Sequence, residues 1–376
     1  MSPTGNRNAL FVASHSSVSD RPGGVQLCTA EFHQSLTAAG WRLHNVSFSS
    51  DHDIVTRLKR RFFETPYRNK ISANLPILIA SEFRRNECST IFLNQCNILE
   101  IVEDLRMEVA EARLVFLSHG LESVDYLHTL RTKGFGKPFE NSSKSEVLKL
   151  ALQLVAECRQ REFFDATICL SEVEVEIERW LGAKNVTWIP RSVSKNYLEW
   201  APVAGRVGFV GTLDHPPNAE GLILFLRELA SLGSELVVRV VGGPTEDGLR
   251  IAKQFSHVEY LGALSNEELR KEARTWSCFL HPLFCYPRGA STKLAVGIGW
   301  GIPIVTTAAG RRGYRWEDGS LIETVDAKSF TAAVCKLCSE NQRLEDAMQE
   351  VRRVCESSPS LESIASELTD FLGRQT

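Results

Sequence analysis

The chain has 376 residues, which is too long for one hydrophobic core of ordinary size and comfortable for two. Hydrophobic residues make up 43% and charged residues 24%, as in ordinary globular proteins. The formal net charge of −3 argues against a protein that binds nucleic acid through its overall charge. No uninterrupted apolar run approaches the ~18 residues that are needed to span a bilayer.

Residues 1–8 are polar and short, and they predict no secretory signal. The ten cysteines could form disulfides, but they are scattered through apolar segments, where a free cysteine behaves as a small hydrophobe. Without an export signal we expect reduced thiols and a cytoplasmic protein.

Short β-rich runs alternate with amphipathic stretches along the first half of the chain. Residues 22–24 (Pro-Gly-Gly) predict a turn, and the helix after it, over 25–39, ends at Gly40. The predicted strands of this half cover 8–14, 42–48, 90–93, 113–117 and 166–170. Such alternation is typical of βαβ units on a parallel sheet.

A stretch containing Pro and Gly, 198–205, is the best linker candidate, and a second βαβ series follows it. Its predicted strands cover 206–210, 236–241, 258–261, 278–283 and 302–307. Its predicted helices cover 217–232, 266–275, a stretch from Ala290, 327–338, 341–355 and 361–372. We therefore expect an α/β protein with two Rossmann-like, doubly wound domains, 1–200 and 201–376, facing across a cleft that is the default ligand site. The last helix, about 359–373, is expected to pack back on the first domain.

Residues 57–70 break this pattern, because basic and aromatic side chains alternate there. Such a stretch can lie on an anionic membrane surface, or it can be a solvated helix face with core aromatics. Both interpretations stay open.

The segment 277–307 carries the clearest chemistry. A strand, a loop with Pro287 and Gly289, and a helix starting near Ala290 follow one another. The free N–H groups and the positive dipole of a helix start attract anions, and Gly289 lets the backbone approach closely. Arg288 and Lys293 add two positive charges. Residues 287–293 therefore predict a diphosphate cradle, with a connection bearing incidental surface charges as the alternative.

Three segments in this order resemble the donor domain of the group 1, family 4 glycosyltransferases, which have the GT-B fold. They are 206–218, with a glycine-ended strand before Pro-Asn; 258–269, with Gly before an acidic helix start; and 282–307, with Lys293-Leu294 and Gly301-Ile-Pro-Ile-Val. The first half resembles the family less, through 22–25, 118–120, 170–172 and 188–190.

The resemblance implies transfer of a sugar from a UDP- or GDP-sugar, with retention and without a metal or other cofactor. The implied catalytic residues are His119, Arg288 and Lys293. The implied donor-binding residues are Gly23, Gly24, Gly211, Thr212, Gly262, Leu264, Gly289, Ala290, Ser291 and Thr292. The implied acceptor is a glycan, a lipid-linked glycan or a small molecule, as in polysaccharide biosynthesis. Peripheral contact with the inner membrane surface through 57–70 is one of the two open interpretations of that stretch, and contact with nucleic acid is not expected.

Two positions depart from the family pattern. Many members have two glutamates flanking this helix start, and here Arg288 and Val296 occupy their places. In the family the second glutamate meets the donor ribose, which valine cannot do. A donor-binding or scaffolding protein with reduced catalysis is therefore the alternative function. A sugar-nucleotide epimerase is disfavoured, because residues 284–292 contain no carboxylate.

Other signals are weaker. Residues 208–211 are not a dinucleotide fingerprint, because a GxGxxG run is missing. Cys335 and Cys338 have redox or zinc spacing but no second pair, so they are interpreted as core packing, as are Cys278, His281 and Cys285. The acidic series Glu172, Glu174, Glu176 and Glu178 is interpreted as one solvated helix face. His119 follows a buried strand and precedes Gly120, which favours catalysis over a structural role.

Overall fold

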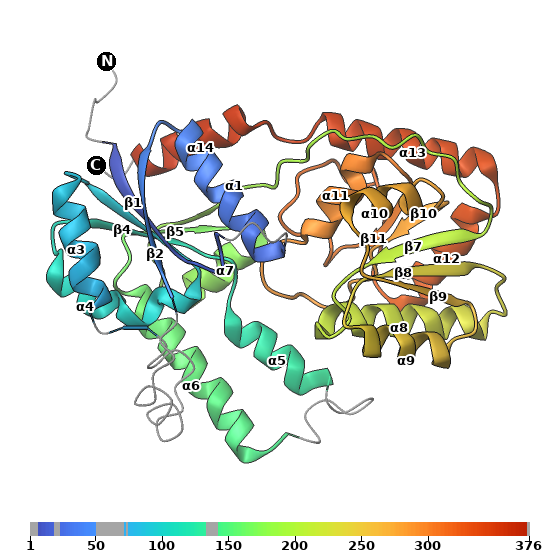
Figure 1. The fold of residues 1–376 in the computed structure, drawn as a ribbon, viewed down its shortest axis with the longest axis horizontal. Coiled ribbons are helices and arrows are strands. Elements are labelled where there is room, and N and C mark those ends of the chain that lie inside the picture. The colour runs from blue at the N-terminus through green and yellow to red at the C-terminus, as the bar shows by residue number, and fades with distance from the viewer. Residues whose placement is uncertain (1–6, 19–22, 50–70, 73, 133–141, 374–376) are drawn as a thin grey trace. The chain divides into compact units, whose positions relative to one another are not determined.

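The computed structural model describes residues 7–18, 23–49, 71–72, 74–132 and 142–373. The chain divides into two units, residues 1–190 with 360–376, and residues 191–359. Each unit is built on its own parallel sheet flanked by helices (Figure 1). Residues 57–70 lie outside the described part, so their predicted membrane contact has no structural counterpart here.

The sheet of the first unit has the strand order β2-β1-β3-β4-β5-β6, and all neighbouring strands are parallel. The strands are β1 (Asn8–Ser14), β2 (Arg42–Phe48), β3 (Thr90–Asn94), β4 (Arg113–Leu117), β5 (Ala166–Cys169) and β6 (Val186–Trp188). The helices are α1 (Gly24–Ala38), α3 (Leu75–Arg85), the 3₁₀ helix η1 (Cys96–Ile101), α4 (Val102–Glu108), α5 (Glu122–Thr132), α6 (Lys144–Arg161), α7 (Glu172–Trp180) and α14 (Leu361–Gly373). Strands β3 and β5 are buried at every residue, as expected of a parallel sheet covered on both faces.

Helix α14 comes from the end of the sequence and lies beside α1 in the first unit (Figure 1). Arg113 Nη1 at the start of β4 donates a hydrogen bond to Leu372 O (2.6 Å). Thr369 Oγ1 donates one to Ala39 O (3.4 Å), just after α1. The last helix thus belongs to the core of the first unit, with Leu368 and Leu372 buried.

The sheet of the second unit has the order β12-β11-β10-β7-β8-β9, again wholly parallel. Its strands are β7 (Arg206–Val210), β8 (Val237–Val241), β9 (Val258–Gly262), β10 (Cys278–Leu280), β11 (Ile304–Thr307) and β12 (Ile322–Thr324). Its helices are α8 (Pro216–Ser231), α9 (Thr245–Gln254), α10 (Asn266–Ala273), α11 (Thr292–Trp300), α12 (Ala327–Cys338) and α13 (Asn341–Glu356).

Two glycines of the second unit are required by close packing. A Cβ added to Gly208 in β7 would lie 1.9 Å from the indole ring of buried Trp276. A Cβ added to Gly221 in α8 would lie 1.7 Å from Pro282 O, directly after β10. Helix α8 can therefore approach the end of β10 only because position 221 has no side chain.

Most strand predictions are confirmed, and four of them (8–14, 42–48, 113–117 and 206–210) have the observed bounds. The segment after β10 differs. The strand ends at Leu280, because Pro282 has no N–H with which to continue the ladder, and α11 begins at Thr292 rather than near Ala290. The loop between them is longer than predicted.

The acidic series on α7 does not form a solvated face, so that interpretation is wrong. Glu172 and Glu176 are exposed, whereas Glu174 and Glu178 are buried. Residues two apart on a helix point to different sides, so alternating glutamates must divide between solvent and core. By contrast, the packing interpretation of Cys335 and Cys338 is confirmed, since both pack against the core cluster that contains Cys278. All ten cysteines are free.

Candidate anion site

The order of the second sheet creates a switch point between β7 and β10. From β7 the chain continues outward through β8 and β9, and it then returns to the other side of β7 to form β10, β11 and β12. In open α/β sheets ligands bind at the carboxyl ends of the strands that flank such a point. Gly211 is the first residue after β7, and His281 is the first after β10. The predicted glycine and the loop that leads to the predicted cradle therefore leave neighbouring strands.

Lys293 reaches back to the end of β7. It is the second residue of α11, and a Cβ added to Gly211 would lie 3.3 Å from Lys293 Nζ. The same Cβ would lie 2.8 Å from the ring of Phe209, so position 211 has no room for a side chain. Two residues predicted separately from the sequence, Gly211 and Lys293, are thus neighbours.

The ammonium group of Lys293 has a lower pKa than an ordinary lysine. Burial lowers its pKa to about 8, because a charged amine loses its hydration there. A half-buried cation of this kind attracts a contacting anion more strongly than a fully hydrated cation does. The free N–H groups at the start of α11 offer further anion ligands, because Ser291 makes no side-chain cap to them.

His281 explains why Ser291 leaves the helix uncapped. Its Nε2 lies 2.8 Å from Ser291 Oγ, and its Nδ1 lies 2.8 Å from Thr306 Oγ1 in β11. Burial, with the nearby charges of Lys293 and Arg312, lowers the pKa of His281 to about 3, so the ring is neutral at pH 7. The Ser291 hydroxyl is therefore engaged by the imidazole and turned from the helix N–H groups.

Arg312, which no local sequence pattern indicates, supports the same loop from another side. Its side chain is buried, and its Nη2 donates a hydrogen bond to Gly289 O (2.8 Å) while its Nη1 donates one to Ala309 O (2.6 Å). Gly289 has φ +66, a conformation that favours glycine. Tyr314 Oη donates to Ser291 O. His281, Arg312 and Tyr314 thus fix residues 289–291 at one end of α11.

The remaining predicted residues of this unit lie in the loop before α11, beside Gly211, and at or just after the end of β9. Arg288, Ala290 and Thr292 are half-buried within or beside the loop, and Thr212 is exposed next to Gly211. Gly262 ends β9 with φ +76. Since β9 is two strands from β7, Gly262 lies about 10 Å across the sheet from the end of β7. Leu264 packs its side chain against the core.

Val296, which replaces the family glutamate, lies on α11 one turn after Thr292 and is 41% exposed. Its side chain makes no part of the buried core at that turn. The position is therefore open to a longer side chain.

In the first unit, the predicted residues lie around the start of α1 and the end of β4. Gly23 is the N-cap of α1 with an extended φ of −158, and Gly24 is the first helical residue. Buried His119 follows β4, and its Nε2 lies 2.9 Å from Asn94 Oδ1 at the end of β3. Asn94 Nδ2 in turn donates to Thr29 Oγ1 on α1 (3.0 Å). Asn94 and Thr29, which no sequence motif indicates, tie the His119 ring to α1.

Within the described residues, no group of three or more His, Cys, Asp or Glu side chains could hold a metal ion. Among the described helices, none is both long and apolar enough to cross a membrane.

Comparison with known proteins agrees with this architecture. Residues 204–340 match the family described as glycosyl transferases group 1. A search of curated proteins finds no match. Sucrose-phosphate synthase from Thermosynechococcus elongatus is similar in structure, with a TM-score of 0.67, 15% identity and 98% of each chain covered.

Two further structures resemble the chain. Anabaena HepE in complex with UDP-glucose has a TM-score of 0.63 and 14% identity, covering 98% of this chain and 99% of its own. An E. coli structure described as trehalose-6-phosphate with bound UDP-2-fluoro glucose has a TM-score of 0.62 and 10% identity, with 98% of each chain covered. At these identities the likeness concerns the fold, and it confirms the predicted two-domain α/β architecture of GT-B type.

Proposed function

We propose that this chain, a glycosyltransferase whose residues 204–340 belong to group 1, transfers a sugar from a UDP-sugar to a glycan, lipid-linked glycan or small-molecule acceptor. The observation that carries the proposal is the position of the Lys293 ammonium beside Gly211, at the start of α11 and at the switch point of the sheet. A cation, a helix start and a side-chain-free strand end together suit a nucleoside diphosphate.

The chemistry required of this site is to stabilise the diphosphate as it leaves. Lys293, Arg288 and the first N–H groups of α11 would share the developing charge, so the proposed transfer needs no metal. His119 would contact the transferred sugar, Gly23 and Gly24 the phosphates, and residues 262–264 the base. Retention of configuration follows the family resemblance. Uridine is favoured over guanosine because two of the similar structures hold UDP-sugars.

We further propose that the protein acts in the cytoplasm on an acceptor recognised by its first unit. Peripheral contact with the inner membrane surface through 57–70 remains a prediction from the sequence. The described residues neither include that stretch nor test it.

Nucleotide binding provides the first test. We expect UDP to raise the melting temperature of the protein more than GDP or ADP, because a ligand that binds only the folded form stabilises it. A panel of UDP-sugars with candidate acceptors should then release UDP. Failure of all three nucleotides to bind at millimolar concentration would contradict the donor site itself.

Val296 favours one alternative function, a donor-binding or scaffolding protein with reduced catalysis. Binding of UDP without UDP release from any UDP-sugar would support it.

Replacing Val296 by glutamate tests the ribose contact. Val296→Glu should tighten UDP binding by about 10-fold, because a carboxylate that accepts a ribose hydroxyl gains a charge-assisted hydrogen bond. Calorimetric titration measures the change. Val203→Glu is the matched control, since Val203 is similarly exposed at 45% and lies before β7. Equal affinities in both variants and the parent would place the ribose away from α11.

The affinity for UDP should depend on pH. Lys293 has a pKa of about 8 in the free protein, so its charge is present below pH 8 and lost as pH rises through that value. We expect the Kd for UDP to be flat below this pH and to rise by up to about tenfold per pH unit above it. Lys293→Arg should remove this dependence between pH 7 and 9, because arginine stays charged. If the Kd for UDP rose with pH equally steeply in the parent and in Lys293→Arg, the titrating group would not be Lys293.

A further inference from the structure

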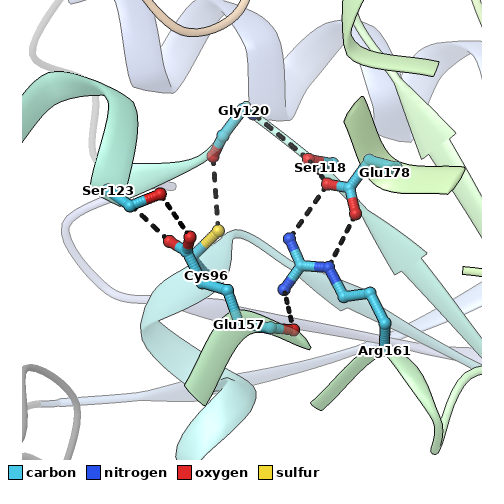
Figure 2. A network of polar contacts seen from close by, with 7 residues as sticks. All are labelled: Cys96, Ser118, Gly120, Ser123, Glu157, Arg161 and Glu178. Carbon is cyan, nitrogen blue, oxygen red and sulfur yellow. Dashed lines mark hydrogen bonds and ion pairs between the residues drawn. The ribbon is translucent and has the colours of Figure 1, made fainter. Parts of the chain in front are cut away.

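The first unit contains a buried ion pair that the proposed function does not use. Arg161, the last residue of α6, and Glu178 of α7 are both 0% exposed. Arg161 Nε donates to Glu178 Oε2 (2.6 Å) and Nη2 donates to Oε1 (2.9 Å), a two-point contact that Figure 2 shows. The guanidinium carbon lies 4.9 Å from the centre of the Phe116 ring in β4. Buried pairs of this kind are often no more stabilising than apolar residues, so a role in fixing geometry is a reasonable hypothesis.

The pair is connected to the backbone on both sides of His119. Ser118 Oγ donates to Glu178 Oε1 (2.9 Å), and the same hydroxyl accepts a hydrogen bond from Gly120 N (3.2 Å). In Figure 2 the Ser118 hydroxyl lies between the Glu178 carboxylate and the Gly120 backbone. Residues 118–123 are called the His119 loop below.

A second buried carboxylate holds the other end of the His119 loop. Glu157 of α6 accepts hydrogen bonds from Ser123 N (3.1 Å) and from Ser123 Oγ (2.5 Å), in the first turn of α5. Cys96 Sγ donates to Gly120 O (3.3 Å). Because Glu157 lies one turn before Arg161, one face of α6 presents Glu157 to the loop and Arg161 to Glu178.

The polarity of α6 agrees with this role. Its buried residues are polar or charged, namely Gln153, Glu157 and Arg161, whereas Leu148 and Val155 are exposed at 59% and 64%. A helix that served only to cover the sheet would bury its apolar side chains. On the inward face of α6, Glu157 instead accepts hydrogen bonds from Ser123 of the His119 loop, and Arg161 donates to Glu178.

We propose that Arg161, Glu178 and Glu157 are positioning residues that set the His119 loop, and through it the imidazole, for transfer of the sugar. The proposal rests on the proposed role of His119. These three side chains act through Ser118, Gly120 and Ser123 and do not touch the substrate.

Two small substitutions test the proposal while the Arg161–Glu178 pair stays intact. Ser118→Ala removes the hydroxyl between Glu178 and Gly120, and Glu157→Gln removes one acceptor at Ser123. We expect kcat to fall by about 10- to 100-fold, as small misplacements of reacting groups do, with less than about twofold change in KM for the UDP-sugar. The donor KM is spared because the proposed diphosphate grip belongs to the other unit.

Asp165→Asn supplies the matched control in the same unit. It weakens the Arg106–Asp165 ion pair (2.9 Å) at the start of β5, away from the His119 loop. The melting temperature of this variant should fall about as much as those of Ser118→Ala and Glu157→Gln. Its kcat should stay within about twofold of the parent value, because distant sites act independently of one another.

A spectroscopic measurement separates positioning from general stability and does not depend on turnover. Histidine labelled with ¹³C gives one ring signal for each of the nine histidines, and the signal missing in His119→Ala is that of His119. It should shift in Ser118→Ala and Glu157→Gln and stay in place in Asp165→Asn. Unchanged kcat and an unmoved His119 signal in folded Ser118→Ala and Glu157→Gln would overturn the proposal.

The outcomes also distinguish the two levels of inference. If His119→Ala retains full turnover, the proposed role of His119 fails, whatever the network does to the ring signal. If His119→Ala is inactive while both network variants behave like the parent protein, only the positioning inference fails.

Discussion

Lys293→Ala is expected to abolish glycosyl transfer, lowering kcat/KM by about 100- to 1000-fold, the usual cost of losing one preorganised group that stabilises developing charge. The reason is the location of the ammonium, beside Gly211 and at the start of α11, where burial leaves it without full hydration. The same substitution should weaken UDP binding, and calorimetry with a turnover assay measures both losses.

Lys271→Ala provides the control for removing a lysine from the same unit. Lys271 is exposed on α10 and pairs with Glu267 one turn away (2.7 Å), so its loss should leave turnover unchanged. The melting temperature of Lys293→Ala should not fall, because the substitution removes a charge that is only partly hydrated. If a folded Lys293→Ala protein kept the kcat/KM of the parent, the proposed role of Lys293 in stabilising the leaving diphosphate would be contradicted.

Gly221→Ala should destabilise the second unit by about 3 kcal/mol or more, an effect at the upper end for overpacking of a well-filled interior. An added Cβ would lie 1.7 Å from Pro282 O, and a backbone carbonyl cannot rotate away as a side chain could. Helix α8 would have to move from the end of β10, where the loop to Ser291 begins. Urea unfolding measures the loss, and UDP binding should weaken in parallel.

Gly373→Ala is the corresponding control. Position 373 ends α14, and an added Cβ meets no atom of the described residues within 4 Å, so the free energy of unfolding should change by less than about 0.5 kcal/mol. If Gly221→Ala were equally harmless, the close approach of α8 to Pro282 would be contradicted.

The sequence predicted the sheets well because both faces of each sheet are covered. Strands such as β1 and β7 appear as short apolar runs between turn residues, and their bounds follow from local pattern alone. The candidate anion site, which stays a prediction, was proposed from the sequence for a similar reason. Gly211, Gly289 and Lys293 are positions where backbone approach or helix-end electrostatics limits the choice of residue.

The residues that support the site could not be predicted, because tertiary contacts bring them there. His281 looked like a packing residue within an apolar strand, and only the pairing of β10 with β11 places its ring between Thr306 and Ser291. Arg312 lies well beyond the predicted cradle in sequence. Alternating glutamates on α7 resembled surface residues, because their buried partner Arg161 comes from another helix.

The place of α14 has a consequence for synthesis on the ribosome. Sheet β1 to β6 is complete in residues 8–188, but the helix that lies against α1 and bonds to Arg113 is made after the whole second unit. The second unit, residues 191–359, can therefore finish folding before the first does. Until residue 373 emerges, α1 lacks the helix that lies beside it in the folded unit.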